Sequence, residues 1–360
     1  MISVLLAAVI VFGIALYLDR NPKHPTYQTE EPTTVPATEA QVPEAESTVP
    51  TEPAQEETEP MQERFLLTFV GDCTLGCRDS HSYMDYGFTR TIGEDYGFPF
   101  RNVLEYFKND ELTCINLEGT FTDTGNALQK AHTFRGPTSY INILTQNSVE
   151  FVSLANNHTM DYGQVGYDST LATLDGAGIS YVERDGSAIV TTSNGLKIGF
   201  YGAVYYVMET ETITEAIGKL REEADIVIFV PHWGYETNPY RNEDQLELAH
   251  AVIDAGADIV WGSHPHVLQE MEFYNGGVIC YSLGNFSFGG NIYPDDYDSA
   301  LIQQEVIREA DGTVSLGETV VVPVRISTEA YRNNFQPVPY EKGTEDYARV
   351  LRKLALAEKN

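Results

Sequence analysis

The chain has 360 residues, of which 42% are hydrophobic, and its formal net charge at pH 7 is −31. This acidic excess argues against nucleic acid as a partner, because phosphate backbones are bound by basic surfaces. The four cysteines are too few and too scattered for a disulfide scaffold and form no Cys-x-x-Cys zinc motif, so buried free thiols are predicted, with a Cys73–Cys114 bridge as the alternative.

The first apolar segment of the chain is an unbroken run over residues 2–18. As a helix it would measure roughly 26 Å, against a hydrocarbon core of about 30 Å. No basic region and no small-x-small cleavage site accompany it, which favours a transmembrane anchor or signal-anchor over residues 1–20 rather than a cleaved signal peptide. Arg20 and Lys23 follow the run, and the positive-inside rule alone would keep the remainder in the cytoplasm. A start codon assigned too late would remove this conflict, and we expect a single-pass cell-membrane protein with its main domain outside the cytoplasm.

The next segment, residues 21–63, is rich in Pro, Thr, Glu and Ala and has few large apolar residues. Such a composition buries too little surface to fold, so a disordered linker is predicted. It would span from roughly 36 Å as a coil to roughly 130 Å when extended. We interpret it as a stalk that holds a domain away from a bilayer, or otherwise as a linker of no specific length.

Short apolar strands then alternate with helix-like stretches in one large domain, residues 64–328. Strands are expected at 65–70, 112–117, 151–155, 180–182, 198–203, 226–230 and 258–261, and helices at 103–108, 140–146, 166–177, 214–223 and 244–255. This alternation predicts an α/β fold rich in parallel strands. No helix separates the apolar runs 278–283, 300–307 and 314–324, so the sheet is expected to finish in antiparallel hairpins. A C-terminal extension, 329–360, contains a predicted surface helix at 351–357.

Two late strands each run directly into histidine, as Pro231-His232-Trp233-Gly234 and as Gly262-Ser263-His264-Pro265-His266. Ligands of open α/β sheets gather at the carboxyl ends of the strands. Imidazole is the commonest metal ligand in proteins, and a His-x-His pair lets two rings reach neighbouring ions. A hydrogen-bonded core histidine and a polar turn are the alternatives.

Earlier strands end in further residues that can bind metals: Asp72, Glu118 and Asn157-His158. Carboxylates and imidazoles that converge in this way suit two divalent ions about 3.5–4 Å apart. The mixed nitrogen and oxygen ligands fit manganese, iron or zinc better than calcium. Helix N-capping is the alternative role for Asp72 and Glu118.

Six motifs, in order, resemble the bacterial capsule-synthesis protein CapA family, which is associated with poly-γ-glutamate production and belongs to the metallophosphatase-like (calcineurin-type) superfamily. They are Gly71-Asp72 with Leu75-Gly76, Asn116-Leu117-Glu118, Ala155-Asn156-Asn157-His158 with Asp161-Tyr162-Gly163, His232-Trp233-Gly234-Tyr235-Glu236, Gly262-Ser263-His264-Pro265-His266-Val267-Leu268-Gln269, and Tyr281-Ser282-Leu283-Gly284-Asn285-Phe286. The resemblance covers roughly residues 66–327. It implies a four-layer α/β/β/α sandwich with the metals at strand ends.

The resemblance also implies a role for each site residue. Asp72 and His266 would bind the first ion, Asn157, His232 and His264 the second, and Glu118 would bridge the two. His158 would be the general acid, oriented by Asp161. Asn116, Glu236 and Asn285 would support the ligands or contact substrate, and Arg135 would meet an anionic substrate or form a structural salt bridge.

Two departures from the classical phosphoesterase pattern bear on function. Thr74 stands where that pattern has a histidine, and Glu118 replaces an aspartate, so the first metal site is expected to be weak or empty. The leading hypothesis is a membrane-tethered, extracytoplasmic, metal-dependent hydrolase of capsule, poly-γ-glutamate or cell-wall polymer synthesis. The alternatives are a non-catalytic accessory subunit that guides an anionic polymer in a membrane synthesis and export complex, and a surface-display module with a structural metal.

Overall fold

The computed structural model describes residues 62–204 and 209–356. The expected anchor over residues 1–20 and nearly all of the expected linker lie outside these residues. All described residues belong to one compact unit, 58–360. Within the described ranges, no helix is long and apolar enough to cross a membrane.

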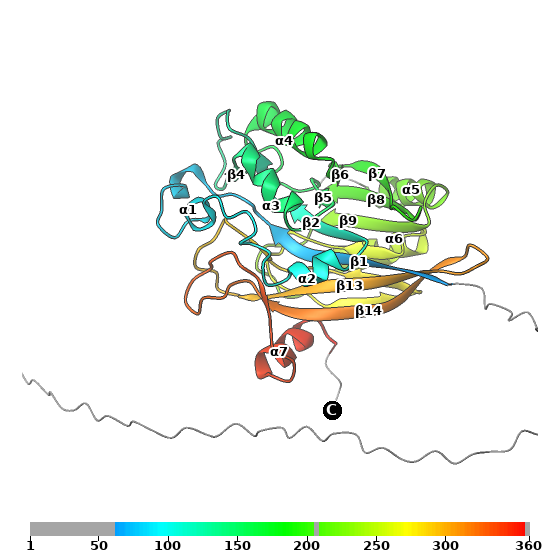
Figure 1. Cartoon of the computed structure of the whole chain (residues 1–360). Helices are drawn as coiled ribbons and strands as arrows, with labels where there is room; N and C mark the ends of the chain where they lie inside the picture. Colours follow the sequence, from blue (N-terminus) through cyan, green and yellow to red (C-terminus); the bar gives the residue numbers. More distant parts are fainter. Residues whose placement is uncertain (1–61, 205–208, 357–360) are drawn as a thin grey trace, which may run out of the picture. The chain divides into compact units, whose positions relative to one another are not determined.

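The first of two large sheets has seven strands, and its parallel strands all come from the first half of the described residues (Figure 1). Its order is β15-β14-β13-β1-β2-β5-β6. The parallel strands are β1 (Glu63–Cys73), β2 (Leu112–Leu117), β5 (Phe151–Ser153) and β6 (Ser180–Val182). The antiparallel strands are β13 (Asp298–Arg308), β14 (Val314–Arg325) and β15 (Val338–Pro339).

A second, six-stranded sheet carries the two histidine strands. Its order is β11-β12-β10-β9-β8-β7. Four parallel strands form its centre: β12 (Gly277–Cys280), β10 (Ile259–Trp261), β9 (Ile226–His232) and β8 (Lys197–Val204). The antiparallel edges are β11 (Met271–Tyr274) and β7 (Gly186–Thr191). A separate pair joins β3 (Thr120–Phe121) to β4 (Arg135–Gly136).

Helices cover the outer faces of both sheets. The helices are α1 (Phe88–Ile92), α2 (Leu104–Lys108), α3 (Ile141–Thr145), α4 (Gly163–Ala177), α5 (Thr210–Arg221), α6 (Glu243–Asp254) and α7 (Glu345–Lys353), with 3-10 turns η1 (Asp79–His81) and η2 (Thr138–Tyr140). Side chains of α1 to α4 share a core with the seven-stranded sheet, and those of α5 and α6 share one with the six-stranded sheet. The expected α/β class, with a helix, sheet, sheet, helix order of layers, is therefore confirmed.

A third hydrophobic core fills the space between the two sheets. Its contacts hold the ends of β1 and β10 together. Phe69 of β1 and Trp261 of β10 pack with ring centroids 5.5 Å apart. The indole nitrogen of Trp261 donates to the carbonyl oxygen of Val70 at 2.9 Å. Because Val70 precedes Asp72 by two residues, this contact ties the end of β1 to the loop that carries His264.

Several elements differ from the prediction. The C-terminal helix starts at Glu345 rather than residue 351, and it is not a pure surface helix because Val350 and Leu354 are buried in the core between the sheets. Strand β7 was missed because its residues are alternately half-buried and exposed, with no long apolar run. Helix α5 starts at Thr210, four residues early. All four cysteines are buried and free, as predicted.

Candidate metal centre

The predicted ligands meet where strands of the two sheets end. Asp72 lies at the end of β1, Glu118 directly follows β2, and His158 lies in the loop after β5. From the other sheet, His232 is the last residue of β9 and His264 lies in the loop after β10. The seven-stranded sheet therefore supplies the carboxylates, and the six-stranded sheet supplies most of the imidazoles.

Glu118 is the centre of this arrangement. Its side chain is completely buried, and neither carboxylate oxygen has a hydrogen-bond partner. Its Oε1 lies 3.9 Å from Nε2 of His158, 3.9 Å from Nε2 of His232 and 3.8 Å from Nε2 of His266. Burial raises the pKa of Glu118 to about 8. Burying a carboxylate without a hydrogen-bond partner costs folding free energy. The three imidazole nitrogens lie too far from it to form hydrogen bonds, but at a distance that leaves room for a metal ion between them.

Asp72 and His266 complete the group predicted for the first ion. Oδ1 of Asp72 accepts a hydrogen bond from Asn116 at 2.9 Å, and Oδ2 lies 3.2 Å from Nδ1 of His266. Ligand atoms of Asp72, Glu118 and His266 all lie within 4.8 Å of one another. Burial would lower the pKa of His266, but the charges of Glu118 and Asp72 raise it to about 10. The Asn285 side-chain oxygen lies 3.0 Å from the same His266 nitrogen.

His232 is oriented for ligation by a serine that the sequence did not single out. The Ser263 hydroxyl donates to the Pro231 carbonyl at 3.3 Å and lies 2.9 Å from Nδ1 of His232, which places the ring proton on Nδ1. Nε2 then faces the site, 3.1 Å from the side-chain oxygen of Asn157. Burial and the neighbouring His264 keep the pKa of His232 well below its usual range. A neutral ring with a fixed tautomer is the form that binds metals.

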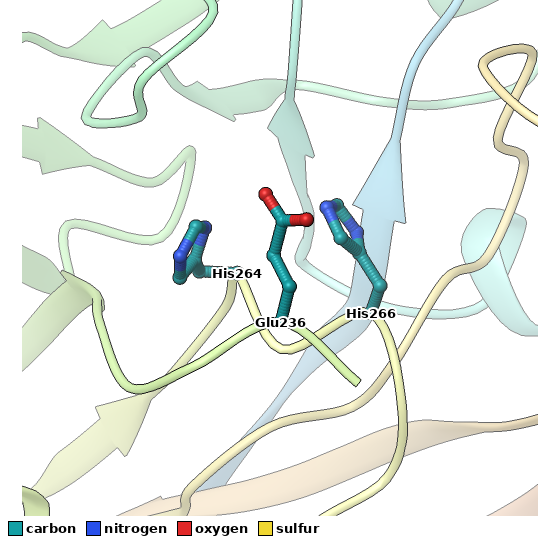
Figure 2. A group of neighbouring side chains, drawn as sticks. All are labelled: Glu236, His264 and His266. Atoms are coloured by element: carbon teal, nitrogen blue, oxygen red, sulfur yellow. The ribbon is translucent and has the colours of Figure 1, made fainter. Parts of the chain in front are cut away.

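The loop after β10 has an unusual backbone and brings in an additional carboxylate. His264 and His266 have φ angles of 98° and 59°, a region that residues other than glycine seldom adopt. Burial, followed by the charge of His266, lowers the pKa of His264 to about 4. Figure 2 shows the Glu236 carboxylate between the two rings, and ligand atoms of the three residues lie within 4.8 Å of one another. Glu236, predicted to support the ligands, thus lies near enough to be one.

His158 and Asp161 form a buried pair beside the carboxylates. Nδ1 of His158 lies 2.8 Å from Oδ2 of Asp161, so Nε2 is directed towards Glu118. Asp161 also accepts from the Lys130 ammonium and from the backbone N–H of Phe134, each at 2.6 Å. Lys130 lies in a loop without a recognisable motif, and its role was not predicted. Burial lowers the pKa of His158, and Asp161 opposes that shift.

Thr74, which stands in place of the classical histidine, has a structural contact. Its hydroxyl donates to the backbone oxygen of Glu118 at 2.8 Å. Behind the ligands, the Asn156 side chain donates to Asn116 at 3.1 Å, and Asn116 in turn holds Asp72. These contacts fix the two carboxylates. The group of Asp72, Glu118 and His266 contains one imidazole.

A cavity of about 720 Å³ opens onto His158, Glu236 and His266. Arg135, predicted to meet an anionic substrate or to form a structural salt bridge, does not line it. Its Nε lies 2.9 Å from Asp79, and its guanidinium lies 4.8 Å from the centre of the Tyr162 ring. The geometry therefore shows the salt bridge.

The fold and the site define an α/β protein with two mixed sheets and a candidate divalent-metal centre at their strand ends. Residues 66–290 match the family of the bacterial capsule synthesis protein PGA_cap, and the chain belongs to that family. The resemblance inferred from the six motifs is therefore confirmed.

Relatives of known name agree with this membership. The chain is 31% identical over 311 residues to the PGA biosynthesis protein CapA of Bacillus subtilis (strain 168), covering 80% of this chain and 77% of that protein. It is also 31% identical over 293 residues to the capsule biosynthesis protein CapA of Bacillus anthracis, covering 73% and 68%. A probable polyglutamine synthesis accessory protein of Mycobacterium tuberculosis is 28% identical over 229 residues, covering 53% and 60%.

Solved structures show a more distant likeness. A putative 5'-nucleotidase of Staphylococcus aureus matches 81% of this chain and 58% of its own, with 13% identity and a TM-score of 0.43. The NAD nucleotidase of Haemophilus influenzae matches 82% and 63%, with 13% identity and a TM-score of 0.41. The chain thus spans less than two thirds of either structure, and similarity this weak assigns no activity.

Proposed function

We propose that this protein is a divalent-metal-dependent hydrolase that acts on poly-γ-glutamate or a related anionic polymer of the capsule or cell wall. The observation that carries this proposal is the buried Glu118 carboxylate, which has no hydrogen bond and has three imidazole nitrogens 3.8–3.9 Å from one oxygen. Family membership and the names of the relatives support the polymer class. The apolar run 2–18 supports a single-pass anchor over residues 1–20, and the composition of residues 21–63 supports a stalk, for an extracytoplasmic domain.

The residues fit two divalent ions, with manganese, iron or zinc as the candidates. Asp72, Glu118 and His266 would hold the first ion, and His232, His264 and Asn157 would hold the second, with Glu118 shared. Glu236 is the further ligand within reach. When bound, such a pair lowers the pKa of a shared water and binds the oxygens of the reacting group.

His158 supports a hydrolytic role because its ring pairs with Asp161, a carboxylate that is not among the proposed metal ligands. With Nδ1 held by Asp161 at 2.8 Å, its Nε2 would deliver a proton to the leaving group. The negative charge of Asp161 would stabilise the protonated ring, and Lys130 and the Phe134 N–H would hold Asp161 in place. An amine leaving group of a γ-amide, or the alkoxide of a phosphoester, needs this proton.

The test combines metal analysis with turnover. The purified full chain would be analysed for metals and assayed on poly-γ-glutamate and on a chromogenic phosphodiester. We expect His158→Ala to lose turnover and keep its metal, and His250→Ala to keep both, because His250 pairs with Glu272 at 3.0 Å outside the site. Unchanged metal content in both His232→Ala and His264→Ala would refute the metal centre.

A second candidate is a non-catalytic accessory subunit of a membrane synthesis and export complex. The replacement of an imidazole by Thr74 favours it, and so does the name of the mycobacterial relative, a probable polyglutamine synthesis accessory protein. Full metal occupancy, polymer binding and no turnover on either substrate would select this candidate over the hydrolase.

A further inference from the structure

Arg78 is an arginine without a partner beside the metal centre. Every other arginine in the described ranges has a carboxylate partner or, for Arg325, backbone carbonyl partners. No ion pair or side-chain hydrogen bond of Arg78 occurs among the described residues, and its Nε is buried without a partner. In a chain with a net charge of −31, carboxylates are abundant, so an unpaired guanidinium next to a cavity points to a ligand.

Arg78 lines the same cavity as the metal centre. His158, Glu236 and His266 line this cavity, and so do Arg78, His81 and His132. The volume of about 720 Å³ lies within the range of ligand-binding cavities.

Of the described lysine and arginine side chains that line the cavity, Arg78 is the one without a carboxylate partner. Lys353 also lines the cavity, but its ammonium lies 2.7 Å from Asp296 and 2.8 Å from Asp298. Asp295 and Glu236 are the remaining carboxylates of the lining. Among the described residues that line the cavity, Arg78 is therefore the permanent cation that no carboxylate neutralises.

The two imidazoles next to Arg78 add hydrogen-bonding groups rather than charge. Burial, followed by the charge of Arg78, lowers the pKa of both His81 and His132, so both rings are neutral near pH 7. His81 Nδ1 is buried without a hydrogen-bond partner. The His132 ring stacks on Phe134, whose ring centroid lies 4.5 Å from that of His158. The rings of His132 and Phe134 thus connect the surroundings of Arg78 to His158, the proposed general acid.

We propose that Arg78, assisted by His81 and His132, binds a carboxylate of an acidic polymer while a neighbouring bond of the polymer lies at the metal centre. The planar guanidinium donates two parallel hydrogen bonds to a carboxylate, which a lysine cannot do. A local cation also offsets the repulsion between an acidic protein and an acidic chain. This subsite rests on the proposed function for its substrate class, but its binding test needs no turnover.

The experiment measures binding of labelled oligo-γ-glutamate to the full chain loaded with manganese or zinc. We expect Arg78→Ala to weaken binding about 10-fold or more, the usual effect of losing a charge-assisted hydrogen-bond partner, and Arg78→Lys to recover part of it. Arg101→Ala is the matched control, because Arg101 pairs with the exposed Asp95 at 2.7 Å and does not line the cavity. Oligo-γ-isoglutamine with an amidated C-terminus, which has the same backbone amides and carboxamides in place of the carboxylates, should bind weakly to all variants.

The metal content and melting temperature of each variant show whether the substitution affects folding. If Arg78→Ala is unstable, the binding affinity of Arg78→Lys is compared with that of the wild type instead. Equal binding of oligo-γ-glutamate by the wild type and a folded Arg78 variant would overturn the subsite. Binding of inorganic phosphate through Arg78, with no binding of oligo-γ-glutamate, would overturn its assignment to a carboxylate. Arg78-dependent binding without any turnover would keep the subsite and reject the hydrolase.

Discussion

The Ser263 hydroxyl offers a sharp test of the metal centre because it touches a ligand without being one. It is nearly fully buried at 4% exposure and lies 2.9 Å from Nδ1 of His232. In Ser263→Ala, His232 loses the group that fixes its tautomer and ring orientation. Loss of such outer contacts costs about 10–100-fold in metal affinity, or about 1.4–2.8 kcal/mol.

The same substitution should cost about 1–3 kcal/mol of stability in the metal-free protein, because it leaves a buried Nδ1–H of His232 without an acceptor. Ser299→Ala is the matched control: Ser299 is completely buried in β13, and its hydroxyl donates to the Leu283 carbonyl at 2.9 Å. It should lose stability and keep metal affinity.

Calorimetric titration of the metal-free full chain with Zn²⁺ or Mn²⁺ measures the affinity, and urea unfolding measures the stability. If Ser263→Ala binds metal as tightly as the wild type, then His232 does not bind the metal through Nε2 with its proton on Nδ1. If both serine variants lose affinity equally, the loss reflects general destabilisation and the reasoning fails.

Three further predictions follow from other contacts. Glu236→Gln should lower metal affinity about 10-fold and leave the melting temperature unchanged, since Glu236 is exposed yet within ligand range of His264 and His266; equal affinity by calorimetry would exclude it as a ligand. Asp161→Asn should lower kcat by about 100-fold or more at unchanged metal content, because general acid catalysis contributes about 10²–10⁴-fold; a loss of metal instead would contradict its positioning role. Burial would raise the pKa of Asp298, but hydrogen bonds from Arg349 and Lys353 lower it from 3.8 to about 2. Because the folded-state pKa is the lower one, this carboxylate stabilises the fold by about 2 kcal/mol above pH 4, and the contribution is lost as pH falls from about 4 towards 2. In urea unfolding, Asp298→Asn should remove that part of the acid dependence, and an unchanged profile would disprove it.

The strand ends could be predicted from sequence because buried apolar runs stop abruptly at polar residues. Asp72, Glu118 and His232 were all located in this way, and the structure brings their side chains to one place. That the carboxylates and the late histidines come from two different sheets followed only from the family resemblance, since alternating strands and helices fit a single sheet equally well.

The position of Glu236 within ligand range could not be predicted, because it depends on loop backbone angles that the sequence does not signal. Thr237, next to Glu236, has a φ of 61°, and His264 and His266 also have positive φ angles without being glycine. These angles bring Glu236 to the two rings. Ser263 and Arg78 likewise acquire their roles from tertiary contacts, and neither belongs to a pattern that a single sequence reveals as functional.

The charges of the site connect metal binding to the polymer. Asp72, Glu118 and Glu236 place three carboxylates around the proposed ions, while burial keeps His232 and His264 neutral. Without ions, the raised pKa values of Glu118 and His266 leave Glu118 largely protonated and His266 positively charged at pH 7, so this group has little net charge to attract a polyanion. Two divalent cations would more than neutralise the three carboxylates and make the centre attractive to an anionic chain. The ions would therefore serve both candidate functions, since an accessory subunit that guides poly-γ-glutamate needs the same positively charged centre as a hydrolase that cleaves it. Metal dependence of polymer binding alone cannot separate the two functions, and the proton-donating pair His158 and Asp161 is the feature that only the hydrolase requires.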